Sequence, residues 1–189
     1  MQRKLKLALV TLVIILAAEL AILTYQQGYY TGLAQVKPEL EIHVNVLVEH
    51  ADGTVEGPFH HAGTLTNTGK EYIEGKLGNN AFANNTAFAE YITLSTDTSS
   101  PSATWINIPS EITTGGLARA QGTYTSTGTG QWKIEKQFTA SATHTNVQLT
   151  GLNWASGASS GSLMCADTFT AVTLNSGDKI TVTWTVSVS

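Results

Sequence analysis

The chain of 189 residues is poor in charge and has a single cysteine. Charged residues make up 13% of it, about half of the roughly 25% found in an average soluble domain. The lone Cys165 excludes an internal disulfide, and no neighbouring base or cation favours a reactive thiol, so we expect a buried structural cysteine. The net charge of −4 argues against nucleic acid as a partner, because phosphate binding needs a basic patch.

The chain also lacks the motifs of common enzyme classes, including a Gly-x-Ser-x-Gly elbow, a His-Glu-x-x-His helix and a phosphate loop. Histidines gather near acidic residues at positions 43, 50, 60 and 61, but their spacing matches no zinc pattern. We therefore interpret them as solvated strand and turn side chains. The sequence predicts a protein that is not an enzyme, with no catalytic residue, no cofactor and no metal site.

What the chain does have is alternation of apolar and polar residues, clearest in residues 116–189. In its final run one face collects Ile180, Val182, Trp184, Val186 and Val188. Period two is typical of a strand with one buried face, and glycine-rich and serine-rich turns separate the runs. This pattern predicts an all-β fold, an antiparallel sandwich of jelly-roll or immunoglobulin-like form with one short helix.

The N-terminal residues 7–25 form an apolar run with one charge, Glu19, and Arg3, Lys4 and Lys6 precede it. Such a run is long enough to cross a bilayer as a helix, and the basic residues place the N-terminus in the cytoplasm. The segment exceeds the usual ~7–15 residues of a signal-peptide core, so we favour an uncleaved signal anchor over a cleaved signal peptide.

Three regions follow from this organisation: a transmembrane helix in residues 1–25, a linker in 26–39 and an extracellular β domain in 40–189. Glu19 is costly in lipid, which suggests a helix–helix contact in an assembly. Type IV pilins carry a glutamate in a comparable helix, but the cleavage signature that precedes it there is missing here. Glu19 is therefore a candidate assembly residue.

The first strand is expected at residues 40–49, where the apolar face consists of Leu40, Ile42, Val44, Val46 and Val48. It follows a flexible segment and Pro38, so it can pair within its own domain or leave to join a neighbour's sheet. We expect an open edge on the terminal strand 179–189, because little chain remains beyond it. The five apolar residues are therefore assembly candidates.

Several local features give more specific expectations. Asn67 or Thr68 is expected to cap a helix over 70–77 that stops at Gly78. Gly115 and Gly116 suit a tight corner before a strand over 117–127. Residues 175–178 are expected to form a hairpin turn, as are residues 51–53.

Other residues suggest single contacts or modifications. Arg119 is expected to form a surface ion pair with Glu111 or Asp167. Asn84 begins the one Asn-x-Thr sequence that we interpret as a glycosylation candidate. The expected core aromatics are Trp132, Phe138, Trp154, Phe169 and Trp184, and any that is exposed could form a carbohydrate-binding platform.

From about His61 onward the chain resembles a family of structural proteins of tailed phages and related surface proteins of archaea and bacteria. The segments that carry the resemblance are residues 62–73, 89–97, 111–120, 132–140 and 169–178. The resemblance covers roughly two thirds of the chain, and the order of the segments is more specific than any one of them. It implies an all-β virion, tail-associated or surface module and brings no catalytic residues. The N-terminal membrane segment departs from tail proteins and shifts the expectation toward an anchored surface protein.

Two function classes therefore remain. The favoured one is a structural subunit of an extracellular filament, surface assembly or virion, which binds other copies of itself and the membrane through residues 7–25. The alternative is a membrane-anchored adhesin that binds surface glycans through exposed aromatic side chains. Both place the β domain outside the cell.

Overall fold

The computed structural model describes Glu19, Leu20, Ile22, residues 39–78 and residues 87–189. The chain divides into two units, residues 1–38 and residues 39–189, and the second contains the β domain. Its elements, in chain order, are β1 Leu40–Glu49, β2 Val55–Ala62, β3 Thr64–Leu65, α2 Asn67–Leu77, β4 Tyr91–Ser95, β5 Ala120–Gln121, β6 Thr123–Gly128, β7 Gln131–Thr139, β8 His144–Asn153, β9 Leu163–Leu174 and β10 Lys179–Val188. The prediction of an antiparallel β-sandwich with one short helix is confirmed for the described residues.

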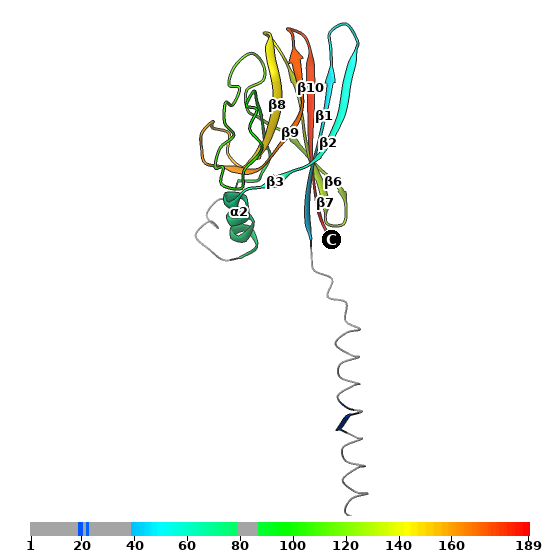
Figure 1. Cartoon of the computed structure of the whole chain (residues 1–189), viewed down its shortest axis with the longest axis vertical. Helices are drawn as coiled ribbons and strands as arrows, with labels where there is room; N and C mark the ends of the chain where they lie inside the picture. Colours follow the sequence, from blue (N-terminus) through cyan, green and yellow to red (C-terminus); the bar gives the residue numbers. More distant parts are fainter. Residues whose placement is uncertain (1–18, 21, 23–38, 79–86) are drawn as a thin grey trace, which may run out of the picture. The chain divides into compact units, whose positions relative to one another are not determined.

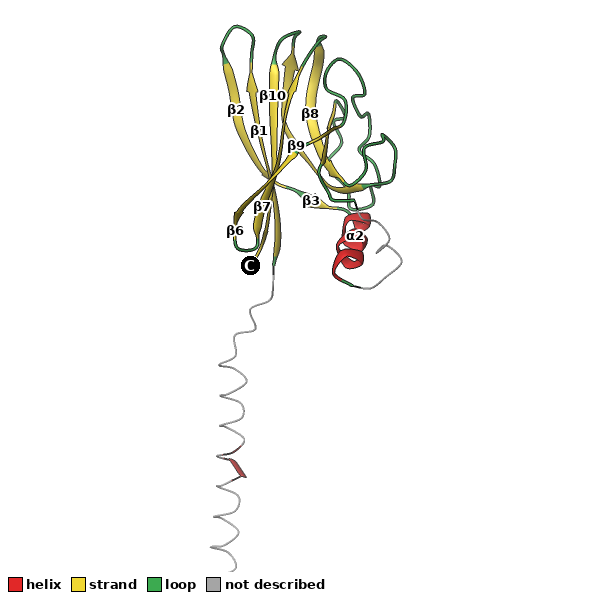
Figure 2. Cartoon of the chain, turned by 180° about the vertical axis from the view of Figure 1, so that it is seen from behind, coloured by secondary structure: helices red, strands yellow, loops and turns green. Residues whose placement is uncertain are grey.

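The strands form two five-stranded sheets, which we name sheet A and sheet B (Figures 1 and 2). Sheet A has the order β2-β1-β10-β7-β6, and sheet B has the order β3-β9-β8-β4-β5. Every strand pair is antiparallel. The chain changes sheet between β2 and β3, β5 and β6, β7 and β8, and β9 and β10. Each sheet is therefore formed by segments that are far apart in the sequence.

The core lies between the sheets and follows the alternation in the sequence. Along β1 and β10 every second side chain is buried, and in sheet A the pairs Val44–Trp184 and Val46–Val182 lie directly opposite each other. Phe59 of β2 stacks on Phe169 of β9 with ring centroids 6.4 Å apart, which joins the two sheets. Four of the five expected core aromatics are buried, and Trp132, the second residue of β7, is only half-buried.

Helix α2 packs on sheet B, close to the start of β9. Its N-cap is Thr66, so the expected cap at Asn67 or Thr68 is wrong by one or two positions. The Thr66 hydroxyl accepts a hydrogen bond from the backbone N–H of Gly69 and donates to the carbonyl of Leu163, 2.6 Å away. Gly69 has to lack a side chain, because a Cβ there would meet the carbonyl oxygen of Met164. At the other end Gly78 caps the helix, as expected.

Three expectations about connections are corrected. Residues 175–178 form a turn, but it joins β9 of sheet B to β10 of sheet A and is not a hairpin. The strand expected over 117–127 is split at Gly122 into β5 and β6, which belong to different sheets. The terminal strand β10 has no open edge, since β1 and β7 pair with its two sides.

The remaining turns agree with the expectations. Gly116 has a φ of +83° and forms a tight corner with Gly115. Residues 50–54 connect β1 and β2, with the N–H of His50 donating to the carbonyl of Thr54 at 2.8 Å.

Most of the expected membrane segment, residues 7–25, and the glycosylation candidate Asn84 lie outside the described residues. Within that segment Glu19, Leu20 and Ile22 are described, and all three are helical and exposed. Among the residues that are described, no helix has the length and apolar character needed to cross a membrane.

Candidate functional site

The β domain begins and ends at the same place. The backbone N–H of Glu39 donates to the carbonyl of Ser189 at 3.0 Å, and the N–H of Ser189 donates to the carbonyl of Glu39 at 3.1 Å. This pair extends the β1–β10 ladder, which runs without a break from Leu40–Val188 to Glu49–Lys179. The segment before β1 therefore joins the domain at a strand that is paired over its whole length.

Strand β1 lies inside sheet A, with β10 on one side and β2 on the other. Four of its assembly candidates, Ile42, Val44, Val46 and Val48, are buried in the domain core, and Leu40 is partly buried. In the described structure β1 thus pairs within its own domain, one of the two pairings that the sequence allowed. Exchange of β1 between copies stays a prediction.

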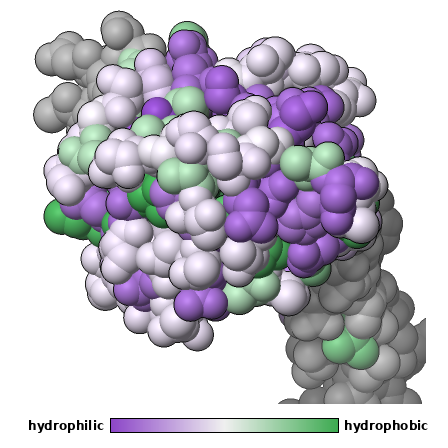
Figure 3. Space-filling model, turned by 90° about the horizontal axis from the view of Figure 1, so that it is seen from above, coloured by the Kyte–Doolittle hydropathy of each residue, from purple (hydrophilic) through white to green (hydrophobic). Residues whose placement is uncertain are grey.

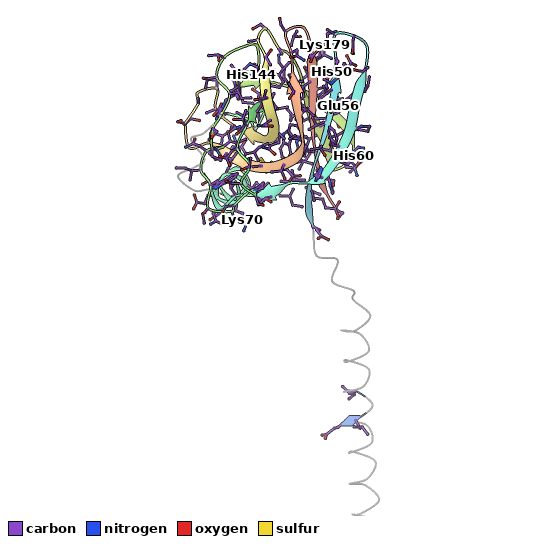
Figure 4. All side chains as sticks on the ribbon, turned by 45° about the horizontal axis from the view of Figure 1, so that its top comes forward. His50, Glu56, His60, Lys70, His144 and Lys179 are labelled. Atoms are coloured by element: carbon purple, nitrogen blue, oxygen red, sulfur yellow. The ribbon has the colours of Figure 1, made fainter. Side chains whose placement is uncertain are left out.

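At the opposite end of sheet A, His50 joins the β1–β2 connection to the turn before β10 (Figure 4). Its Nδ1 lies 2.8 Å from a carboxylate oxygen of Asp178, and its Nε2 lies 2.8 Å from one of Glu56. Asp178 also accepts hydrogen bonds from the backbone N–H groups of Ala51 and Asn175, each at 2.8 Å. We call His50, Glu56 and Asp178 the histidine clasp.

The clasp shifts the pKa values of its central groups in opposite directions. Hydrogen bonds to Asp178 and then to Glu56 raise the pKa of His50 above its ordinary value of 6.5. Backbone N–H donors from Asn175 and Ala51, followed by His50, lower the pKa of Asp178 from 3.8 to about 2. The turn residues were expected from the sequence, but the clasp was not, because it joins residues 128 positions apart.

The clasp gives a testable pH dependence. A raised histidine pKa stabilises the fold below about 6.5, and this contribution is lost as the pH rises through the folded-state pKa. The Asp178 contribution is present above its ordinary 3.8 and is lost as the pH falls toward about 2. We therefore expect the melting temperature to decline between pH 6 and 8 and the decline to be weaker in a His50→Gln variant.

Thermal unfolding followed by circular dichroism at several pH values measures this effect. His60→Gln is the matched control, because His60 is an exposed histidine of β2 and should leave the decline unchanged. An undiminished decline in His50→Gln would show that the clasp does not link folding to pH.

A second cluster of polar side chains, centred on Arg119, holds together the irregular segments beside sheet B. Arg119 forms a two-pronged pair with Glu111, in which Nη2 and Nε lie 2.8 and 2.9 Å from its two carboxylate oxygens. Its Nη1 donates to the carbonyl of Ala155 and to the hydroxyls of Ser160 and Ser162. The Arg119 and Glu111 side chains are only 3% and 7% exposed. The expected surface pair is therefore a buried one, and its partner is Glu111, not Asp167.

Asp167 has a different environment. The backbone N–H of Thr168 donates to its Oδ1, while its buried Oδ2 has no hydrogen-bond partner among the described residues. Burial raises the pKa of Asp167 above its ordinary value. Cys165, two residues earlier, is fully buried, and burial raises the pKa of its thiol well above the usual range. The expectation of a buried structural thiol is confirmed.

No metal-binding cluster is built on the part of the chain that the structure describes. Seen from above, the β domain shows mainly residues of intermediate hydropathy with polar and apolar residues scattered among them (Figure 3). Of the described aromatic side chains, Phe88 and Tyr124 are the exposed ones. Phe88 precedes β4 of sheet B and Tyr124 lies on β6 of sheet A, so they do not share a sheet face.

The four sheet edges differ in how open they are. In sheet B both edge strands, β3 and β5, have two residues each. In sheet A the edge strand β2 contains Pro58, and its pairing with β1 shifts register between Val46 and Val48. Strand β6 contains neither proline nor charge, and all six of its residues are exposed. Sequence reasoning missed this edge, because it assigned the open edge to β10.

Comparisons with protein-family models, with curated proteins and with solved structures gave no match.

Proposed function

We propose that the chain is a non-enzymatic structural surface protein, a subunit of an extracellular filament, surface assembly or virion. Residues 7–25 anchor it in the membrane, and the β domain lies outside the cell. The neutral surface rich in threonine, serine and asparagine supports this location. Such surfaces give little self-repulsion and favour contact between copies.

The observation that carries the proposal is the attachment of the preceding segment to β1. A pull on that segment acts along a strand that β10 and β2 hold on both sides. Antiparallel hydrogen bonds lie perpendicular to the strands, so such a force loads many of them together and does not open them one by one. The two backbone hydrogen bonds between Glu39 and Ser189 hold together the end of the β1–β10 ladder to which the force would be applied. This arrangement suits a domain that stays folded under tension.

The fold supports the same class of protein. The chain passes between the sheets after every two or three strands, and its first and last strands are neighbours. Antiparallel two-sheet folds of jelly-roll form occur in viral capsid proteins, which agrees with the resemblance to phage and archaeal surface proteins.

The adhesin alternative has less support. A glycan platform needs exposed aromatic rings that act together, whereas Phe88 precedes β4 of sheet B and Tyr124 lies on β6 of sheet A. Four of the aromatic residues that could have formed it are buried in the core.

The location is tested by adding protease to intact cells that express the chain. We expect the β domain to be removed from the outside while a cytoplasmic control protein survives. Complete protection of the β domain would contradict the proposed topology.

Negative-stain microscopy of the purified full chain tests the structural class. A structural subunit should form regular polymers or layers, and an adhesin should appear as single particles. Single particles at every concentration, together with binding to a glycan array, would favour the adhesin.

A further inference from the structure

We propose that strand β6 pairs with β6 of a second copy of this chain, antiparallel and around a two-fold axis through Thr125. This inference rests on the proposed structural function and gives it a specific interface. The pair would convert two five-stranded A sheets into one continuous sheet across both copies.

The first argument is the contrast among the sheet edges. An exposed edge presents unpaired N–H and C=O groups, and natural edges are usually protected by shortness, proline, bulges or charge. Strands β3 and β5 are short, and β2 has Pro58 and a register shift. The six residues of β6 have one irregularity, between Ser126 and Gly128, and no other protection. Thus, among the described edge strands, β6 is the one that is longer than two residues and lacks proline and charge, and its single irregularity lies at its end, beyond Ser126.

The second argument is charge, which makes another copy of the chain a suitable partner. Strand β6 carries no ionisable group apart from the Tyr124 phenol, so two copies bring no like charges together. The nearest charges on β7, Lys133 and Glu135, pair with each other at 3.0 Å. A basic or acidic partner would find no complementary charge on this strand.

The third argument fixes the register. Directly opposed residues of antiparallel strands share a sheet face, so a two-fold axis through Thr125 sets Tyr124 opposite Ser126 of the second copy. Ser126 itself lies opposite the half-buried Trp132. Tyr124 is 59% exposed, so its ring can reach over a small serine toward the Trp132 ring of the second copy. This contact would cover an aromatic side chain that is otherwise in water.

The two-fold axis also fixes the orientation of the copies. Gly128 lies at the end of sheet A where the domain begins, because the neighbouring Gly130 accepts a hydrogen bond from Val188. Antiparallel pairing sets Gly128 toward the start of β6 in the second copy, so the two Glu39 residues lie at opposite ends of the joined sheet. The pair would thus join two β domains that point in opposite directions. It would not join neighbours anchored side by side.

Engineered cysteines test the register, since the native Cys165 is fully buried and does not compete. The full chain is purified in detergent and oxidised with copper phenanthroline. Opposed Cα atoms in such a pair are about 4.5–5.5 Å apart, within disulfide range. We expect Thr125→Cys to crosslink with itself, whereas Thr123→Cys crosslinks with Thr127→Cys but not with itself. Self-crosslinking at both Thr123 and Thr125 would indicate parallel strands and overturn the proposal.

A charge substitution tests whether β6 drives association. Thr125→Lys places two positive charges at the two-fold axis, and Val55→Lys adds the same charge to the exposed edge strand β2 as a matched control. In sedimentation velocity we expect Thr125→Lys to raise the dimer dissociation constant at least tenfold and Val55→Lys to leave it unchanged. A wild-type chain that stays monomeric, or equal effects of both variants, would refute β6 pairing. Protease sensitivity on intact cells reports location alone, so failure of the interface and failure of the proposed location are distinguishable.

Discussion

Replacing Arg119 with alanine should lower the melting temperature of the β domain by roughly 6–20 °C. The substitution leaves the Glu111 carboxylate, 7% exposed, without its cation. Removing one partner of a buried ion pair costs about 3–5 kcal/mol, and a domain of this size loses ~2–4 °C per kcal/mol. It also removes the donor to Ala155, Ser160 and Ser162, so the loop before β9 should become more sensitive to protease.

Thermal unfolding of three further variants separates the effect of burying the ion pair from the effect of losing a charge. Lys133→Ala is the matched control, because the Lys133–Glu135 pair is 33% and 41% exposed and should cost about 1 kcal/mol or less. Arg119→Lys keeps the charge but loses the planar fork, so its melting temperature should also fall. The double variant Arg119→Met with Glu111→Leu should recover part of the loss, since no unpaired charge remains. Equal small falls in melting temperature for Arg119→Ala and Lys133→Ala would show that the buried pair stabilises the domain no more than the exposed one.

Period-two alternation was sufficient to predict the all-β fold and the buried faces of β1 and β10. Where one face is buried, a strand must place its apolar residues on that face, so the inward positions of β10 could be assigned from the sequence. Glycines at turns were equally informative, since the positive φ angles of Gly53 and Gly116 suit glycine far better than other residues.

Strand pairing could not be predicted in the same way. Alternation identifies the buried face of a strand but not its neighbours, which depend on where the chain crosses between sheets. The terminal strand β10 was expected at an edge because little chain follows it, yet β1 and β7 enclose it. The open edge belongs instead to β6, whose residues look in sequence like the continuation of a longer strand.

The burial of the Arg119 cluster could not be predicted for a related reason. The sequence offered Glu111 or Asp167 as the partner of Arg119, and only the packing of residues 155–162 around the pair determines that it is buried. The histidine clasp joins the end of β1 to the turn before β10, and no local motif connects His50 with Asp178. A histidine at the end of a strand and an aspartate closing a turn become informative only once β1 and β10 are known to be neighbours.

Removing residues 1–50 should abolish folding of the β domain, whereas removing residues 1–38 should leave it folded. The longer deletion removes β1, whose inward side chains Ile42, Val44, Val46 and Val48 are 0–6% exposed. Burying each is worth about 1.5–3 kcal/mol, so their loss approaches the ~5–15 kcal/mol that stabilises a whole domain. Circular dichroism and the fluorescence of the buried Trp184 report the outcome.

The same truncated chain decides whether β1 can be exchanged between copies. A peptide of residues 40–49 offers the missing strand, with ten backbone partners on β10 from Val188 to Lys179. If the slot accepts a strand from another molecule, the peptide should restore folding, and a peptide with Val44→Asp and Val46→Asp should not. Restoration would support donation of β1 to a neighbouring subunit in the proposed assembly. If the chain lacking residues 1–50 does not fold with any excess of the native peptide, donor pairing loses its support and β6 remains the interface to test.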